Sequence, residues 1–137
     1  MKKVVLISVV FLSLLGCLPN DEHTTFTQEL VPIVSVSVPD TLVFREDYTF
    51  EITYDRPSNC HAFRGFWYEK NENERIIGVI NDVYNNPNCQ APEDSLATAE
   101  LNFEVLRDDF YIFKFWQGED ENGEPIYLTK EVPVKME

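Results

Sequence analysis

From residue 30 onward, apolar and polar residues alternate with a period of two, which is the pattern of half-buried β-strands. The clearest runs are Val34–Val38, Tyr48–Tyr54 and Leu101–Val105, in which every second residue is apolar. Enrichment in β-branched and aromatic residues predicts four more strands, namely His61–Glu69, Arg75–Tyr84, Phe110–Gln117 and Ile126–Val134. No window of eleven or more residues carries a helical hydrophobic stripe. The pattern therefore predicts an all-β domain of seven strands.

The same alternation predicts which side chains of these strands are buried. The expected buried set is Phe50, Ile52, Phe103 and Val105, and the expected exposed set is Thr49, Glu51, Asn102 and Glu104. A slip of one residue would exchange the two sets, so they test the register directly. Asn122-Gly123, between the last two runs, is typical of a tight hairpin turn.

Seven strands at this spacing favour a two-sheet antiparallel sandwich, with a barrel as the main rival. Residues 30–134 resemble an immunoglobulin-like domain, because Trp67 falls on the third strand and Leu106–Tyr111 enters the sixth strand like the tyrosine corner of that family. The cross-core disulfide usual in antibody domains is absent, since neither strand that would carry it contains cysteine. The resemblance implies that the third and sixth strands lie side by side.

The first residues of the chain have the composition of an export signal. Lys2 and Lys3 precede the apolar run Val4–Leu15, which as a helix would span about 18 Å. That length is short of a hydrocarbon core of about 30 Å, so a cleaved signal is favoured over a membrane span. The run ends in Leu14-Leu15-Gly16-Cys17, which resembles the lipobox of bacterial lipoproteins. The alternative is an ordinary signal peptide with an incidental cysteine.

The lipobox resemblance implies lipidation at Cys17, with diacylglycerol on the thiol. It also implies cleavage just before Cys17, after which the new amino group of the cysteine carries an acyl chain such as palmitate. It divides the chain into a signal peptide at 1–16, a lipidated cysteine and flexible tether at 17–29, and the sandwich domain at 30–137. Leu18 replaces the aspartate of an inner-membrane retention signal, so the outer membrane is expected, with its periplasmic or surface face left open. Asn20-Asp21-Glu22 is similar to the acidic patch that sends Bacteroidota lipoproteins to the surface.

Two cysteines remain once Cys17 is lipidated, and an envelope compartment permits them to pair. Cys60 lies between the second and third predicted strands, and Cys89 lies between the fourth and fifth. The loops that carry them share one end of an immunoglobulin-like sandwich, so a Cys60–Cys89 disulfide is expected. The alternative is a pair of free reactive thiols.

The composition restricts the chemistry open to the chain. Among 137 residues, 24 acidic side chains face 11 basic ones, for a net charge of −13, which argues against nucleic-acid binding. The only histidines are His23 and His61, too few for a zinc site or for an obvious nucleophile–histidine pair. No catalytic residue, metal or cofactor is therefore predicted. A glycan hydrolase stays open, and would need two convergent carboxylates 5–10 Å apart.

Surplus aromatic and acidic residues are the remaining candidates for a binding site. If Trp67 and Phe63 face the core, Tyr68 faces outward on the third strand, and Trp116 faces outward on the sixth. These two side chains and the acidic turn form the predicted partner site: Tyr68, Trp116, Glu119, Asp120 and Glu121. The turn is interpreted as a solvated acidic tip, with calcium binding as the alternative. The tether is expected at the opposite end of the domain or along an edge.

Taken together, the chain resembles the small Bacteroidota lipoproteins that carry one immunoglobulin-like domain. The predicted function is that of a non-catalytic binding module, held to the membrane by its N-terminal lipid and contacting an envelope protein or glycan. Two alternatives are an inhibitor or accessory protein of an envelope enzyme and, less favoured, a glycan-acting enzyme.

Overall fold

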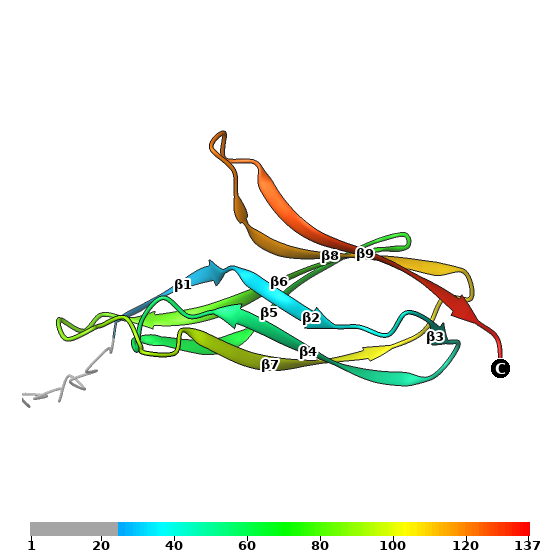
Figure 1. Cartoon of the computed structure of the whole chain (residues 1–137), viewed down its shortest axis with the longest axis horizontal. Helices are drawn as coiled ribbons and strands as arrows, with labels where there is room; N and C mark the ends of the chain where they lie inside the picture. Colours follow the sequence, from blue (N-terminus) through cyan, green and yellow to red (C-terminus); the bar gives the residue numbers. More distant parts are fainter. Residues whose placement is uncertain (1–24) are drawn as a thin grey trace, which may run out of the picture.

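Nine β-strands make up residues 25–137, which are the part of the chain that the computed structural model describes (Figure 1). They are β1 (Phe26–Val31), β2 (Ile33–Ser37), β3 (Leu42–Val43), β4 (Asp47–Asp55), β5 (His61–Asn71), β6 (Glu74–Tyr84), β7 (Leu96–Glu104), β8 (Phe110–Glu119) and β9 (Pro125–Lys135). The predicted all-β class is confirmed. The predicted signal peptide and the lipidation site at Cys17 lie outside the described residues.

The strands form two sheets in a sandwich-like arrangement. In the larger sheet β6 pairs with β5 on one edge and with β8 and β1 on the other, β8 pairs with β9, and β9 pairs with β3. The smaller sheet has the order β2-β4-β7. The chain crosses from one sheet to the other at Pro32, between β1 and β2. Strands β1 and β3 are additional to the seven predicted. β1 begins at Phe26, inside the stretch assigned to the tether, because its backbone pairs with β6 from Phe26 to Val31.

One edge of β6 is divided between two partners. Its first half, Glu74–Ile77, pairs in parallel with Ile112–Phe115 of β8, and its second half pairs antiparallel with β1 from Val79 onward. β6 therefore separates β5 from β8, whereas an immunoglobulin sandwich puts its third and sixth strands side by side. The predicted adjacency of these two strands is wrong for this reason.

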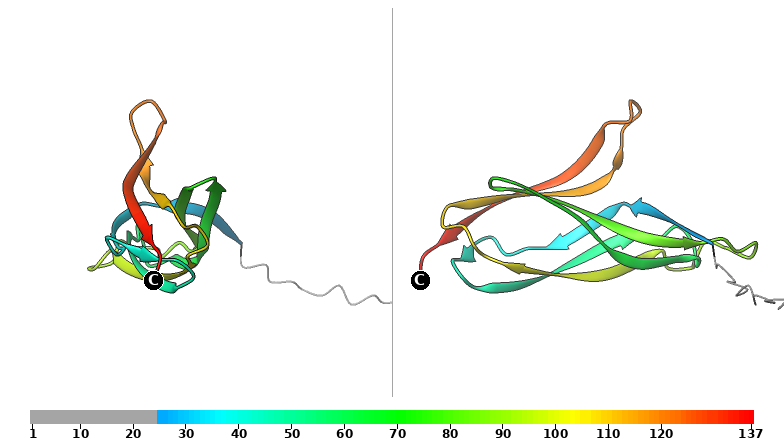
Figure 2. Two further views of the ribbon diagram at one scale, coloured as in Figure 1. Left: turned by 90° about the vertical axis from the view of Figure 1, so that its right-hand side faces the viewer. Right: turned by 180° about the vertical axis from the view of Figure 1, so that it is seen from behind.

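The β8–β9 hairpin bends away from the sandwich (Figures 1 and 2). Because β1 occupies the edge of β6 beyond Ile77, β8 has no place there and leaves the sheet. The bend coincides with a register shift between Trp116 and Glu119, where Gly118 has a φ of 116° that other residues rarely adopt. The turn closes at the predicted Asn122-Gly123.

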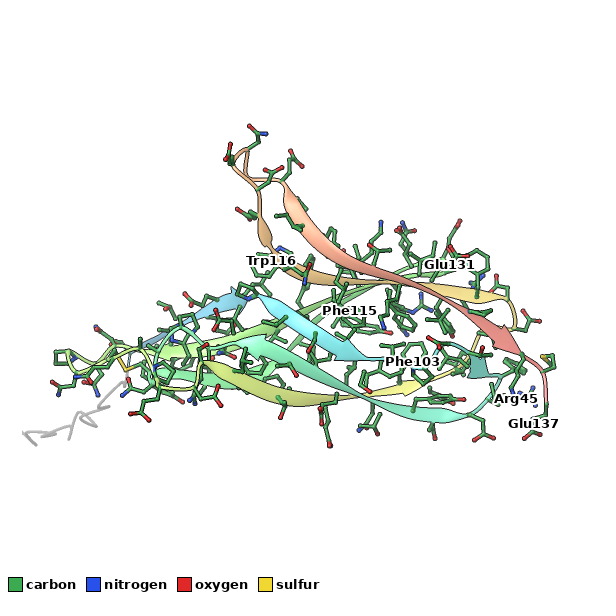
Figure 3. All side chains as sticks on the ribbon, viewed as in Figure 1. Arg45, Phe103, Phe115, Trp116, Glu131 and Glu137 are labelled. Carbon is green, nitrogen blue, oxygen red and sulfur yellow. A yellow bond between two sulfur atoms is a disulfide. The ribbon has the colours of Figure 1, made fainter. Side chains whose placement is uncertain are left out.

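The core lies between the two sheets and is largely aromatic. Phe113 of β8 packs edge-on against Phe50 of β4 and Phe103 of β7, with ring centroids 5.3 and 5.1 Å apart. Phe103 and Phe115 both point into the space between the sheets (Figure 3). The predicted register is confirmed, since the core contains Phe50, Ile52, Phe103 and Val105, whereas Thr49, Glu51, Asn102 and Glu104 are exposed.

The tyrosine at the entry to β8 closes the turn before it. The hydroxyl oxygen of fully buried Tyr111 accepts hydrogen bonds from the backbone N–H groups of Leu106 and Arg107, at 2.9 and 3.0 Å. In the same turn Arg107 forms a two-pronged ion pair with Asp109. The hydrogen bonds from Arg107 and from the backbone hold the pKa of this exposed carboxyl to about 2. The predicted tyrosine corner is therefore present in its local geometry.

Tyr111→Phe should lower the free energy of unfolding by about 1–3 kcal/mol, because two backbone donors of the turn lose the buried hydroxyl that accepts them. Urea denaturation measures the change. Tyr84→Phe is the matched control: Tyr84 is 40% exposed, so its loss should stay within about 0.5 kcal/mol. Equal effects of the two substitutions would contradict the role assigned to the Tyr111 hydroxyl.

Candidate functional site

The outer face of the larger sheet carries a shallow groove built around a glycine. Trp67 of β5 lies opposite Gly78 of β6. A Cβ atom at Gly78 would come within 2.9 Å of Leu30 Cδ2 and 3.1 Å of Trp67 Cε3, so these two side chains meet over the glycine. Ile80, Gln28 and Glu29 complete the lining. Trp67 is half-buried and its indole Nε1–H donates to the exposed Glu69 carboxylate at 3.1 Å.

Trp116 lies on the same outer face, at the base of the projecting hairpin (Figure 3). Its neighbours Phe113 and Phe115 alternate with it and are fully buried in the core, which turns Trp116 outward as predicted. It remains half-buried and pairs across the hairpin with Tyr127 of β9. The outer face thus presents two indole rings, one on each side of β6.

Tyr68 does not face outward, so the predicted orientation of this side chain is wrong. The β5–β6 pairing has a register shift between Phe63 and Gly65, which breaks strict alternation along β5. As a result Phe66 and Tyr68 pack against the core, whereas Trp67, expected in the core, faces solvent. Burial raises the pKa of the Tyr68 hydroxyl, and nearby Arg75 partly offsets that effect.

The predicted acidic residues Glu119, Asp120 and Glu121 are exposed around the β8–β9 turn. The Asp120 carboxylate accepts the backbone N–H groups of Asn122 and Glu124, at 2.8 and 3.0 Å, so it helps to form the turn. Within residues 25–137 no group of three or more His, Cys, Asp or Glu side chains is arranged to hold a metal ion.

The predicted Cys60–Cys89 disulfide is present, with the two Cα atoms 5.5 Å apart. It joins the start of β5 to the β6–β7 loop at one end of the domain. The described chain begins at the same end, where the Asn85 N–H donates to the Thr25 carbonyl at 3.0 Å. The tether was expected at the opposite end of the domain or along an edge, and β1, which contains its last residues, is an edge strand of the larger sheet that starts at this end. The β8–β9 hairpin with its acidic turn bends away from the sandwich (Figure 1).

A hydrogen-bonded chain of three polar side chains, which the sequence analysis missed, lies next to the disulfide. Buried His61 contacts Ser58 Oγ through Nδ1 at 2.7 Å and Glu29 Oε1 through Nε2 at 2.5 Å. The Ser58 hydroxyl also accepts the backbone N–H of Cys60, so it is engaged in the turn. His61 and Glu29 lie on opposite edges of β6. We assign these three hydrogen-bonded side chains a structural role, that of holding β1 and β5 together. The Ser58–His61 contact is local, but Glu29 lies 32 residues from His61 in the sequence, so the contact that joins β1 to β5 gives no local sequence signal.

No known protein family, curated protein or solved structure matches this chain. Within residues 25–137 no helix has the length and hydrophobicity needed to span a bilayer. The fold itself places this protein in the class of all-β domains with a sandwich-like pair of sheets.

Replacing both cysteines, Cys60→Ala with Cys89→Ala, should lower the free energy of unfolding by about 3–4 kcal/mol, since the unfolded chain loses the constraint of a closed loop and gains conformational entropy. Denaturant titration measures this loss. Reducing the wild-type protein should give a similar loss, and reductant should leave the double variant unchanged. A double variant as stable as the oxidised protein would contradict this account of the bridge.

Proposed function

We propose that the protein is a lipid-anchored, non-catalytic binding module of the bacterial cell envelope. The anchor rests on the resemblance of Leu14–Cys17 to a lipobox, and Leu18 in place of a retention aspartate favours the outer membrane. The partner is an envelope protein or a glycan. Nucleic acid is disfavoured by the net charge of −13.

The observation that carries the proposal is the outer face of the larger sheet. Trp67 and Leu30 close over Gly78 and leave a shallow apolar groove, and Trp116 adds a second indole on the far side of β6. Indole rings supply large contact areas with little conformational freedom to lose, so they suit the stacking face of a sugar ring or a protein anchor. Trp67 replaces Tyr68 in the site predicted from sequence.

A relation to immunoglobulin-like domains is the finer part of the proposal. The β2-β4-β7 order corresponds to the first, second and fifth strands of that fold, which share one of its sheets. The Tyr111 hydrogen bonds support the same relation. The position of β6 between β5 and β8 is the feature that distinguishes this chain.

The projecting β8–β9 hairpin favours a second candidate function, that of an inhibitor or accessory protein of an envelope enzyme. A hairpin that leaves the sheet can enter a cleft in a partner without unfolding its own domain. Its exposed tip carries Glu119, Asp120 and Glu121 and would select a cationic cleft.

Cys17→Ala should move the protein from the membrane fraction to the soluble fraction of a bacterial host and abolish labelling by radioactive palmitate. Two or three acyl chains hold a protein to a bilayer, and the polar tether alone would not. The Cys60→Ala/Cys89→Ala variant is the control and should stay lipidated and membrane-bound. Retention of Cys17→Ala in carbonate-washed membranes would disprove the anchor.

Trp67→Ala combined with Trp116→Ala should weaken binding of a partner captured from envelope extract by at least tenfold, because both aromatic anchors are lost. Isothermal titration with the identified partner measures the change. Leu96→Ala with Leu106→Ala removes two exposed apolar side chains elsewhere and should have little effect.

A loss of affinity confined to Glu119→Gln with Glu121→Gln would favour the accessory-protein candidate, since these substitutions alter only the hairpin tip. Unchanged affinity in the tryptophan and the glutamate variants would place the binding site elsewhere and overturn the proposal.

A further inference from the structure

Strand β7 is an open edge of the smaller sheet. Among residues 25–137 it pairs only with β4, over all of Leu96–Glu104 and without a register shift. The second edge of β7 is therefore a row of backbone N–H and C=O groups with which no described strand pairs. Such a row is a template for an added strand.

The other edges of the two sheets carry the devices that normally prevent strand addition. β2 has five residues and a register shift, and β5 has a shift at Phe63–Gly65. β9 contains Pro133 and is covered at its end by β3. β1 has six residues, and it carries the charged Glu29 opposite the buried Asn81, which is an inward-pointing charge of the kind that discourages strand addition. β7 contains no proline, glycine, lysine or bulge.

The side of the sandwich beside β7 is incompletely filled. Tyr68 of β5 lines one groove with Asn102 and Phe103 of β7, so the free edges of β5 and β7 border the same opening. Phe63 contacts the core ring of Tyr54, yet it is 44% exposed. An added strand on β7 would place every second side chain against these aromatic rings.

The outward face of the same sheet is acidic and contains repelling pairs. Asp47 lies directly opposite Glu104, and Glu51 lies directly opposite Glu100. All four are exposed, and β2, β4 and β7 contain no lysine or arginine. Like charges directly opposite each other destabilise a sheet, and none of the ion pairs among residues 25–137 involves these four carboxylates.

We propose that the β7 edge binds an extended segment of a basic partner protein as an added strand. Lysine or arginine at every second position of that segment lies over Glu100 and Glu104. The alternate positions are apolar and cover Phe63 and Tyr68. This surface is separate from the tryptophan face, so the inference stands independently of the proposed function.

A second copy of this chain is the wrong occupant. Pairing of β7 with β7 would bring Glu100 and Glu104 against the same residues of the copy, and each chain has a net charge of −13. The acidic side chains thus oppose self-association and select a cationic strand.

The test uses the full chain in detergent and a fluorescent ten-residue peptide of alternating lysine and valine. Fluorescence anisotropy should show saturable binding, and hydrogen exchange of residues 96–104 should slow while that of the β2 edge, 33–37, should not. A peptide alternating glutamate and valine should bind at least tenfold more weakly. So should the lysine peptide with two central valines replaced by proline, which keeps the charge and prevents strand pairing.

Glu100→Gln with Glu104→Gln should weaken the lysine peptide at least fivefold, and Glu119→Gln with Glu121→Gln, which removes the same charge elsewhere, should leave it unchanged. The first variant relieves cross-strand repulsion, so it should unfold no more easily than the wild type. Trp67→Ala with Trp116→Ala should bind the peptide normally, which separates this test from that of the proposed function.

Three outcomes would overturn the inference. Equal binding of the proline peptide would show attraction of charge without strand addition. Protection at 119–124 would place the peptide on the hairpin tip. Protection of 96–104 that grows with protein concentration in the absence of peptide would show that a second copy occupies the edge.

Discussion

The division of one β6 edge between β8 and β1 determines much of the remaining architecture. Because β1 occupies that edge from Val79 onward, β8 can pair with β6 only up to Ile77 and must then leave the sheet. The departure of the β8–β9 hairpin from the sheet follows from this competition. Since β1 crosses to β2 at Pro32, the same strand also connects the two sheets.

The two outer faces of the domain have opposite chemistry, although they share one core. The larger sheet exposes indole rings and a glycine-floored groove, whereas the smaller sheet exposes carboxylates that repel one another. Phe113 contacts Phe50 and Phe103 across the core, which keeps the sheets at a fixed spacing. The aromatic layer of the core therefore separates the two proposed binding surfaces.

Local sequence patterns predicted the elements better than their arrangement. Alternation predicted the register of β4 and β7, the assignment of Cys17 to lipid left one possible cysteine pair, and Leu106–Tyr111 predicted the tyrosine corner. β1 escaped prediction because its polar residues are ordered by backbone pairing with β6 and not by burial. The parallel β6–β8 pairing joins strands distant in sequence, so no local pattern encodes it.

The candidate site was only partly predictable for a similar reason. Trp116 follows from strict alternation along β8, and it faces outward as expected. Tyr68 and Trp67 exchange faces because one irregularity at Phe63–Gly65 shifts the phase of β5. Bulges depend on twist and packing of the whole sheet, and a strand with aromatic residues at consecutive positions gives no sign of which phase it takes.

The antiparallel pairing of β1 with β6 also bears on mechanical load. The described chain enters β1 at its outer end, beside the disulfide (Figure 1). Hydrogen bonds between antiparallel strands run perpendicular to the strands. A pull on the N-terminus along the strand axis therefore shears the pairs from Phe26–Tyr84 to Val31–Val79 together, and does not open them one at a time. The domain therefore resists a pull along the β1 axis through all six pairs at once.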